Sequence, residues 1–153
     1  MRSLELKLPP PVVAAAVAAA MAAAAYVLPA ADLALPQRAK LAALLAAAGV
    51  LVAAAGVLGF HRHRTTVNPH TPERSTALVT SGIYRYTRNP MYLGLLLVLV
   101  GWAAWLANAA SLPLLPVFVL YLNRYQIAPE ERVLGERFGP AFSDYRAAVR
   151  RWL

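Results

Sequence analysis

Long apolar stretches alternate with short polar segments along this chain. The apolar stretches cover residues 12–28, 39–60, 91–107 and 112–127, and the only charged residues within them are Lys40 and Arg124. A membrane-spanning helix needs about 20 apolar residues, and each stretch reaches or approaches that length. The pattern predicts an all-α integral membrane protein of one domain, residues 1–153, with four transmembrane helices, a loop at 61–90 and a short amphipathic helical tail at 128–153.

The composition agrees with a membrane protein and limits the kinds of site that the chain can build. Hydrophobic residues make up 59% of the 153 residues and charged residues only 14%. Little chain remains for a soluble catalytic domain, so we expect a functional site made from helix ends and their flanks. The absence of cysteine excludes disulfides, thiolate metal sites and cysteine nucleophiles. Glu5, the prolines at 9–11 and the three later apolar stretches argue against a cleaved signal peptide.

Positive charge gathers in the loop at 61–90 and in the tail, whereas the connection after the first stretch offers only Arg38 and Lys40, and the turn at 108–111 offers none. Cytoplasmic loops retain Lys and Arg, so we expect the loop, the tail and both termini to be cytoplasmic, most simply in a bacterial cytoplasmic membrane. Anionic membrane lipids account for the net charge of +8, and no nucleic-acid partner is needed.

The segment "RNPMY" predicts the start of the third span. Asn89 can serve as N-cap and Pro90 as the first helical residue. Arg88 then lies beside the positive end of a helix dipole and needs an anion: a glutamate, a lipid phosphate or a ligand. Glu130 and Glu131 follow Pro129 as the first turn of another helix, and adjacent helical residues point in different directions. One of these glutamates is therefore expected to face inward as the counter-ion of Arg88.

Several other features allow a structural explanation beside a functional one. Tyr84 and Tyr92 suit an aromatic belt at the membrane surface. Gly101 is expected to pack against the fourth span, whereas for Gly94 the approach of a ligand is equally compatible. His61 lies at a helix end rich in positive charge, without the nearby carboxylate or cysteine ligands that a metal site would need, and no metal is expected.

The tail mixes aromatic and cationic side chains. We expect its aromatic residues to lie at the membrane surface with the arginines at the lipid headgroups. The aromatic residues concerned are Phe138, Phe142, Tyr145 and Trp152.

The blocks "LVTSGIYRYTRNPMYLG" and "EERVLGERFGPAFSDYRAAVRRWL", separated by an apolar hairpin, together resemble a family of membrane enzymes. They resemble the isoprenylcysteine carboxyl methyltransferase and phospholipid methyltransferase superfamily, whose pattern is Arg-His-Pro-x-Tyr-x-Gly followed by Glu-Glu. The likeness covers about residues 65–153, and Asn89 stands where the family has histidine.

The resemblance implies binding of S-adenosylmethionine at the cytoplasmic mouth of the hairpin. Arg88 or Arg85 would hold the cofactor carboxylate, and Glu130 or Glu131 its ammonium or ribose hydroxyls. Arg88 and the two glutamates are the predicted catalytic residues. The remaining predicted cofactor contacts are His70, Tyr84, Asn89, Pro90, Tyr92 and Gly94.

The implied activity is methyl transfer to a lipophilic, membrane-resident acceptor, such as the carboxylate of an isoprenylcysteine-like amphiphile. Three alternatives remain open at this point. They are N-methylation of a phospholipid amine, a nicotinamide-dependent membrane reductase, and a non-enzymatic small membrane subunit whose arginines only set its topology.

Overall fold

The computed structural model describes residues 5–62 and 78–153. Within these ranges the chain is helical, and the only extended pairing is an isolated bridge between Asp32 and Asn108. The all-α prediction is therefore confirmed. Residues 63–77, which include the predicted cofactor contact His70, lie outside the described residues.

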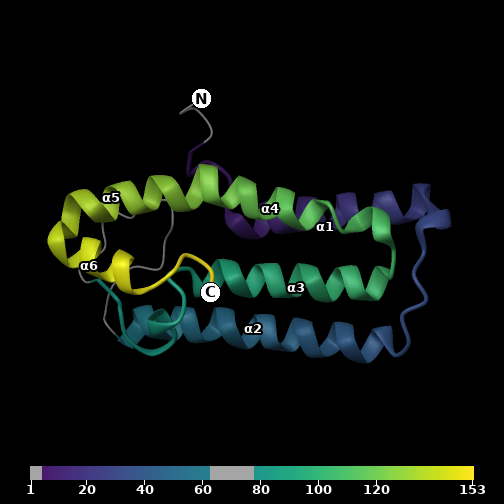
Figure 1. The fold of residues 1–153 in the computed structure, drawn as a ribbon, viewed down its shortest axis with the longest axis horizontal. Helices are drawn as coiled ribbons and strands as arrows, with labels where there is room; N and C mark the ends of the chain where they lie inside the picture. The colour runs from purple at the N-terminus through teal and green to yellow at the C-terminus, as the bar shows by residue number, and fades with distance from the viewer. Residues whose placement is uncertain (1–4, 63–77) are drawn as a thin grey trace.

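The main helices run along the long axis of the molecule (Figure 1). They are α1 (Pro10–Val27), α2 (Arg38–Arg62), α3 (Pro90–Leu106), α4 (Leu114–Leu122), α5 (Ala128–Phe138) and α6 (Pro140–Ala148). Short 3₁₀ turns, η2 (Pro29–Ala31), η4 (Gly82–Arg85) and η5 (Ala109–Ser111), connect them. Helices α5 and α6 and the C-terminus gather at the end of the bundle where α2 ends and α3 begins, as Figure 1 shows.

Two helices, α1 and α2, are long and apolar enough to cross a bilayer. Helix α3 is apolar over 17 residues and α4 over only nine, so the count of four spans stays a prediction. The expected fourth span at 112–127 also differs from the observed helix. Helix α4 begins only at Leu114, after a 3₁₀ turn, and it continues through a π-helical turn, η6 (Asn123–Ile127), directly into α5.

Pro129 explains an unusual contact at this π-turn. Proline has no N–H to donate to the carbonyl four residues earlier, which here belongs to Tyr125. The backbone N–H of Leu6 donates to that Tyr125 carbonyl at 3.0 Å. Gln126 then donates from its side chain to the Leu8 carbonyl at 2.7 Å. The segment before α1 is thereby fixed against the junction of α4 and α5.

Glycines allow α2 and α3 to pack closely along their length. An ideal Cβ on Gly94 would lie 2.5 Å from the carbonyl oxygen of Gly49, and one on Gly101 would lie 2.9 Å from that of Ala42. The expectation that Gly101 packs against the fourth span is therefore wrong, because its backbone faces α2. Gly94 serves the same helix contact, and its proposed contact with a ligand stays a prediction.

We predict that Gly94→Ala destabilises the protein. The new methyl group would clash with the backbone of α2, and such overpacking typically costs about 1–3 kcal/mol. Gly135→Ala is the matched control, since its Cβ would meet only Phe142 Cδ1 at 3.8 Å and alanine favours the helix by roughly 1 kcal/mol. Thermal unfolding in detergent should give a lower Tm for Gly94→Ala and an equal or higher Tm for Gly135→Ala. An unchanged Tm for Gly94→Ala would contradict the close packing.

Candidate functional site

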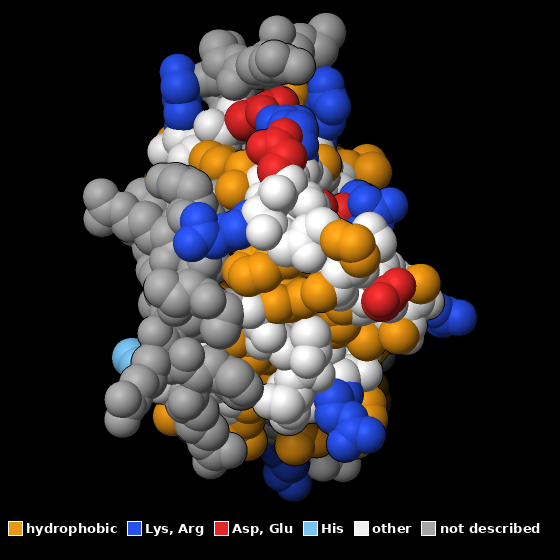
Figure 2. Space-filling view, turned by 90° about the vertical axis from the view of Figure 1, so that its left-hand side faces the viewer, with side chains coloured by type: hydrophobic (Ala, Val, Ile, Leu, Met, Phe, Trp, Pro, Cys, Tyr) orange, Lys and Arg blue, Asp and Glu red, His pale blue; other side chains and the backbone are white. Residues whose placement is uncertain are grey.

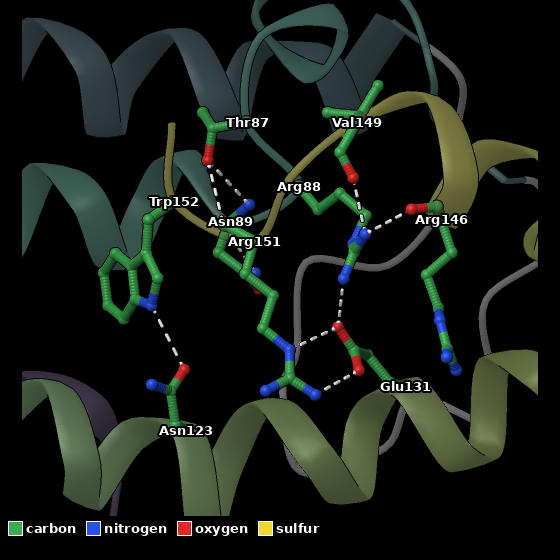
Figure 3. Close-up of polar contacts among 9 residues, drawn as sticks. All are labelled: Thr87, Arg88, Asn89, Asn123, Glu131, Arg146, Val149, Arg151 and Trp152. Atoms are coloured by element: carbon green, nitrogen blue, oxygen red, sulfur yellow. Dashed lines mark hydrogen bonds and ion pairs between the residues drawn. The ribbon is translucent and has the colours of Figure 1, made fainter.

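Arg88 lies immediately before α3 and makes polar contacts with two other parts of the chain. Its Nη2 donates to Oε1 of Glu131, in α5, at 2.6 Å. Its Nη1 donates to the backbone carbonyls of Arg146, at 3.0 Å, and of Val149. The side chains of Arg88 and Glu131 are each about 10% exposed, so this ion pair is largely removed from solvent. The expected counter-ion of Arg88 is therefore Glu131, as Figure 3 shows.

Glu131 also binds a second arginine, from the C-terminal tail. Arg151 donates from Nε to Oε1 at 2.9 Å and from Nη2 to Oε2 at 2.7 Å, which is a bidentate contact. Burial alone would raise the pKa of Glu131, but the hydrogen bonds from Arg151 and Arg88 outweigh it and lower that pKa below its ordinary value. Glu131 is therefore a carboxylate at neutral pH.

Glu130 has a different environment although it is the neighbouring residue. It accepts a hydrogen bond from the hydroxyl of Tyr92, in the first turn of α3. Burial, assisted by the charge of Glu131, raises the pKa of Glu130 to about 8, and the Tyr92 hydrogen bond offsets only part of that effect. At neutral pH the two adjacent glutamates thus differ, with Glu130 mainly protonated and Glu131 ionised.

Arg88 and its two neighbours in the sequence hold the C-terminal tail by hydrogen bonds to the backbone carbonyls of the tail. The Thr87 hydroxyl and Asn89 Nδ2 both donate to the Arg151 carbonyl at 3.0 Å, and the Arg88 N–H donates to the Arg150 carbonyl at 3.0 Å. Asn89 occupies the N-cap position, as predicted, but its side chain binds the tail and makes no capping hydrogen bond.

Pro90 is the first residue of α3, so the predicted start of this helix is confirmed.

Tyr84 is buried between α2 and the tail. Its ring meets Phe60 edge-on with centroids 5.4 Å apart, and its carbonyl accepts from the Tyr145 hydroxyl at 2.7 Å. Burial, with the nearby Tyr145 and Glu130, raises the pKa of Tyr84. Arg85, in the same turn, is exposed and outside the cluster around Glu131. The structure thus brings Arg88, Asn89 and Glu131 together, places the Tyr92–Glu130 pair beside them, and leaves Arg85 apart.

Sequence reasoning missed the residues of the tail. Phe142, which we expected at the membrane surface, is only 3% exposed, and Trp152 donates from its indole to Asn123 Oδ1 at 3.1 Å. Arg151 was not predicted to contact Glu131. The available signal was the aromatic and cationic alternation of the tail, which suits a membrane surface and a protein contact equally well.

An open cleft of about 440 Å³ lies beside this cluster. It is lined by Arg88, Glu131, Arg146, Ala147, Val149, Arg150 and Arg151. The end of the bundle that carries α5 and α6 shows arginine and lysine side chains distributed around a hydrophobic area (Figure 2). The cleft therefore combines guanidinium groups and one carboxylate near apolar surface, a set that suits a charged amphiphilic ligand.

Comparison with known proteins gives a family match and several relatives. A family model described as phospholipid methyltransferase matches residues 38–141. An uncharacterized protein of Haemophilus influenzae is 44% identical over 63 residues, which are 41% of this chain and 100% of that protein. Protein-S-isoprenylcysteine O-methyltransferase A of Arabidopsis thaliana is 31% identical over 101 residues, 66% of this chain and 51% of the relative.

The protein-S-isoprenylcysteine O-methyltransferase of Schizosaccharomyces pombe is 35% identical over 72 residues, 47% of this chain and 30% of the relative. The chain thus matches about half, or less, of the length of these two methyltransferases. No solved structure matches the chain.

The raised pKa of Glu130 predicts a pH dependence of stability. In the unfolded chain this carboxyl ionises near 4.5, whereas in the folded chain it keeps its proton until about pH 8. Between these values the folded state binds more protons, so stability falls as pH rises, and Glu130→Gln removes this fall. Unfolding temperatures at about pH 5, 7 and 9 test the prediction.

Glu136→Gln, an exposed site in the same helix, is the control and should keep the pH dependence of the parent. The same pH dependence in the parent and in Glu130→Gln would contradict the assignment.

Proposed function

Because this chain belongs to the phospholipid methyltransferase family, we propose that it uses S-adenosylmethionine to methylate a lipophilic, membrane-resident acceptor. The proposed acceptor is the carboxylate of an isoprenylcysteine-like or related small amphiphile. The supporting observation is the Arg88–Glu131 ion pair, which joins the "RNPMY" segment to the "EER" segment beside an open cleft. We propose that the acceptor enters from the bilayer, in which the helices α1 and α2, long and apolar enough to cross a membrane, would lie.

The residues of the cluster fit the charged groups of the proposed cofactor. The Nε of Arg88 has no partner among the described residues, but it is buried, so a cofactor carboxylate would reach this donor only after a shift of the surrounding side chains. Arg151 is partly exposed and can supply a second donor. Glu131, ionised at neutral pH, would bind the ammonium group. Because Arg151 holds both oxygens of Glu131, the ammonium would share or displace that contact.

The other predicted contacts extend the same proposal. Asn89 and Pro90 set the start of α3, and Tyr92 holds the Glu130 carboxyl. Arg85 is exposed and outside the cluster, so its proposed contact would require a cofactor that extends beyond Arg88. Tyr84 and Gly94 already serve packing contacts, and we propose that they shape the site rather than bind through polar atoms. His70 completes the proposed set.

The cofactor would supply an electrophilic methyl group bound to a sulfonium sulfur. On transfer, the acceptor atom would form a bond to the methyl carbon, and the electron pair of the methyl–sulfur bond would stay on sulfur. The chain's task is to hold donor and acceptor aligned and to exclude water. A carboxylate acceptor is ionised at neutral pH and needs no base. Arg88 and Arg151 would also offset the acceptor's negative charge during binding.

We expect saturable binding of S-adenosylhomocysteine to the detergent-purified protein, with at least about tenfold weaker binding after Arg88→Ala or Glu131→Gln, because each removes a charge-assisted contact. Isothermal titration calorimetry measures this. Arg132→Ala is the matched control. Arg132 lies in the same helix as Glu131, but its ion pair is with Glu5. The substitution breaks that exposed pair and should leave the affinity for S-adenosylhomocysteine unchanged.

Unfolding temperatures of all variants establish that they are folded. Unchanged affinity in folded Arg88→Ala would remove Arg88 from the cofactor site.

A phospholipid amine is a second candidate acceptor, favoured by one observation. An amine must lose a proton before it can attack, and the pKa of about 8 for Glu130 suits a general base near neutral pH. The proton would pass from the amine to the Glu130 carboxylate as the nitrogen–methyl bond forms.

The two acceptors predict different pH profiles when the chemical step limits the rate. With an amine acceptor, the rate should rise with pH through about 8 as Glu130 ionises, and Glu130→Gln should be slow and lack this rise. With a carboxylate acceptor, the profile should be flat from about pH 6 to about pH 9, because no base is required. A flat profile for the parent would contradict the amine assignment.

A further inference from the structure

Glu131 is bound by more positive charge than its single negative charge requires. Arg88 donates to Oε1 at 2.6 Å, while Arg151 donates to Oε1 at 2.9 Å and to Oε2 at 2.7 Å. One guanidinium is enough to balance one carboxylate, so one of the two arginines can leave without stranding a charge on Glu131. The surroundings of the two arginines decide which one can leave.

Arg88 is the fixed partner of Glu131. Its side chain is only 10% exposed, and its Nη1 also donates to the backbone carbonyls of Arg146 and Val149. Moving Arg88 would break these bonds together with the ion pair, and a largely buried guanidinium without partners is costly. Arg88 therefore stays with Glu131.

Arg151 is the partner that can move. Its side chain is 40% exposed, and within the described part of the chain its guanidinium bonds only to Glu131 (Figure 3). The Arg151 backbone is held independently, because its carbonyl accepts hydrogen bonds from Thr87 and Asn89 at 3.0 Å. The guanidinium can therefore turn within the cleft that it lines while the tail keeps its place.

An ion pair between a glutamate and an arginine of one cleft is complementary to an amino-acid zwitterion. The ammonium and the carboxylate of a free amino acid are joined to the same carbon, so the zwitterion can enter between Glu131 and Arg151. Its ammonium then pairs with Glu131 and its carboxylate with Arg151, which replaces one ion pair by two and adds no net charge. A ligand with only one of these groups would leave one of the two side chains without its partner.

We propose that the Arg151–Glu131 ion pair is the closed form of the cofactor site, and that Arg151 turns from Glu131 to the cofactor carboxylate when the amino-acid end of the cofactor enters. This inference rests on the proposed function. It makes Arg151 a specificity residue, because the closed form favours a ligand that carries both a free ammonium and a free carboxylate. Before such a ligand binds, Arg151 occupies the place of the ammonium on Glu131.

Calorimetric titration of three ligands into the detergent-purified full chain tests the proposal. The ligands are S-adenosylhomocysteine, its amine analogue, in which hydrogen replaces the carboxylate, and its acid analogue, in which hydrogen replaces the ammonium. The parent should bind S-adenosylhomocysteine at least about tenfold more tightly than either analogue, because only the zwitterion gives both side chains a new partner.

Arg151→Gln should change the affinities for the two analogues in opposite directions. The amine analogue should bind at least about threefold more tightly than to the parent, because Glu131 no longer has to release a partly exposed ion pair. The acid analogue should bind at least about threefold more weakly, because its carboxylate loses the Arg151 contact. A purely structural role of Arg151 would instead weaken the binding of all three ligands together.

Arg150→Gln is the matched control. It removes the same charge from the same cleft, whereas the bonds to Glu131 come from Arg88 and Arg151. It should change the affinity for either analogue by no more than about twofold, because an exposed charge acts only weakly through solvent. Equal shifts in Arg150→Gln and Arg151→Gln would show a general effect of cleft charge and overturn the proposal.

Arg151→Lys keeps the charge but lacks the planar fork of donors that binds both oxygens of Glu131. It should shift the affinity for the amine analogue in the same direction as Arg151→Gln but less, and it replaces that variant if unfolding temperatures show that Arg151→Gln is not folded.

The same titrations separate this proposal from the proposed function. If the parent binds S-adenosylhomocysteine but Arg151→Gln does not bind the amine analogue more tightly, the closed form is refuted and the proposed function stands. If neither the folded parent nor folded Arg151→Gln binds any of the three ligands, the cofactor assignment is refuted, and this inference with it.

Discussion

The arrangement of this end of the molecule depends on the charge of Arg88. A guanidinium beside a helix N-terminus is unfavourable by about 0.3–1 kcal/mol, and burying it without partners would cost far more. The chain supplies Glu131 from a helix 43 positions later and two carbonyl oxygens from the tail. Satisfying one buried arginine thus brings the start of α3, α5 and the C-terminus together.

The same constraint separates the chemistry of two adjacent glutamates. Glu131 receives two arginines and is ionised, whereas Glu130 faces Tyr92 and keeps its proton near neutral pH. Adjacent positions on a helix point about 100° apart, so one turn of α5 can present a carboxylate and a carboxylic acid to different neighbours. A site with both forms can bind a cation at one residue and exchange a proton at the other.

The sequence allowed the local features of the site to be predicted, but not the contacts that depend on tertiary packing. Pro90 predicted the start of α3, because proline is favoured as the first residue of a helix. The unfavourable position of Arg88 beside the positive end of the helix dipole predicted a glutamate partner. The contact of Arg151 with Glu131 was missed because aromatic and cationic residues in a tail suit a membrane surface equally well. The packing of Gly101 against α2 was missed because a small residue in the sequence indicates close helix packing but does not indicate which helix is the neighbour.

The most direct test of this account is ultraviolet crosslinking of methyl-labelled S-adenosylmethionine to the detergent-purified chain, followed by mapping of the labelled peptides. Because Arg88 and Glu131 are proposed to hold the cofactor, label should appear in peptides that contain residues 84–94 or 128–153 and should be competed by S-adenosylhomocysteine. Competed label confined to the opposite end of the bundle, in peptides that contain residues 28–40 or 105–114, would contradict the account.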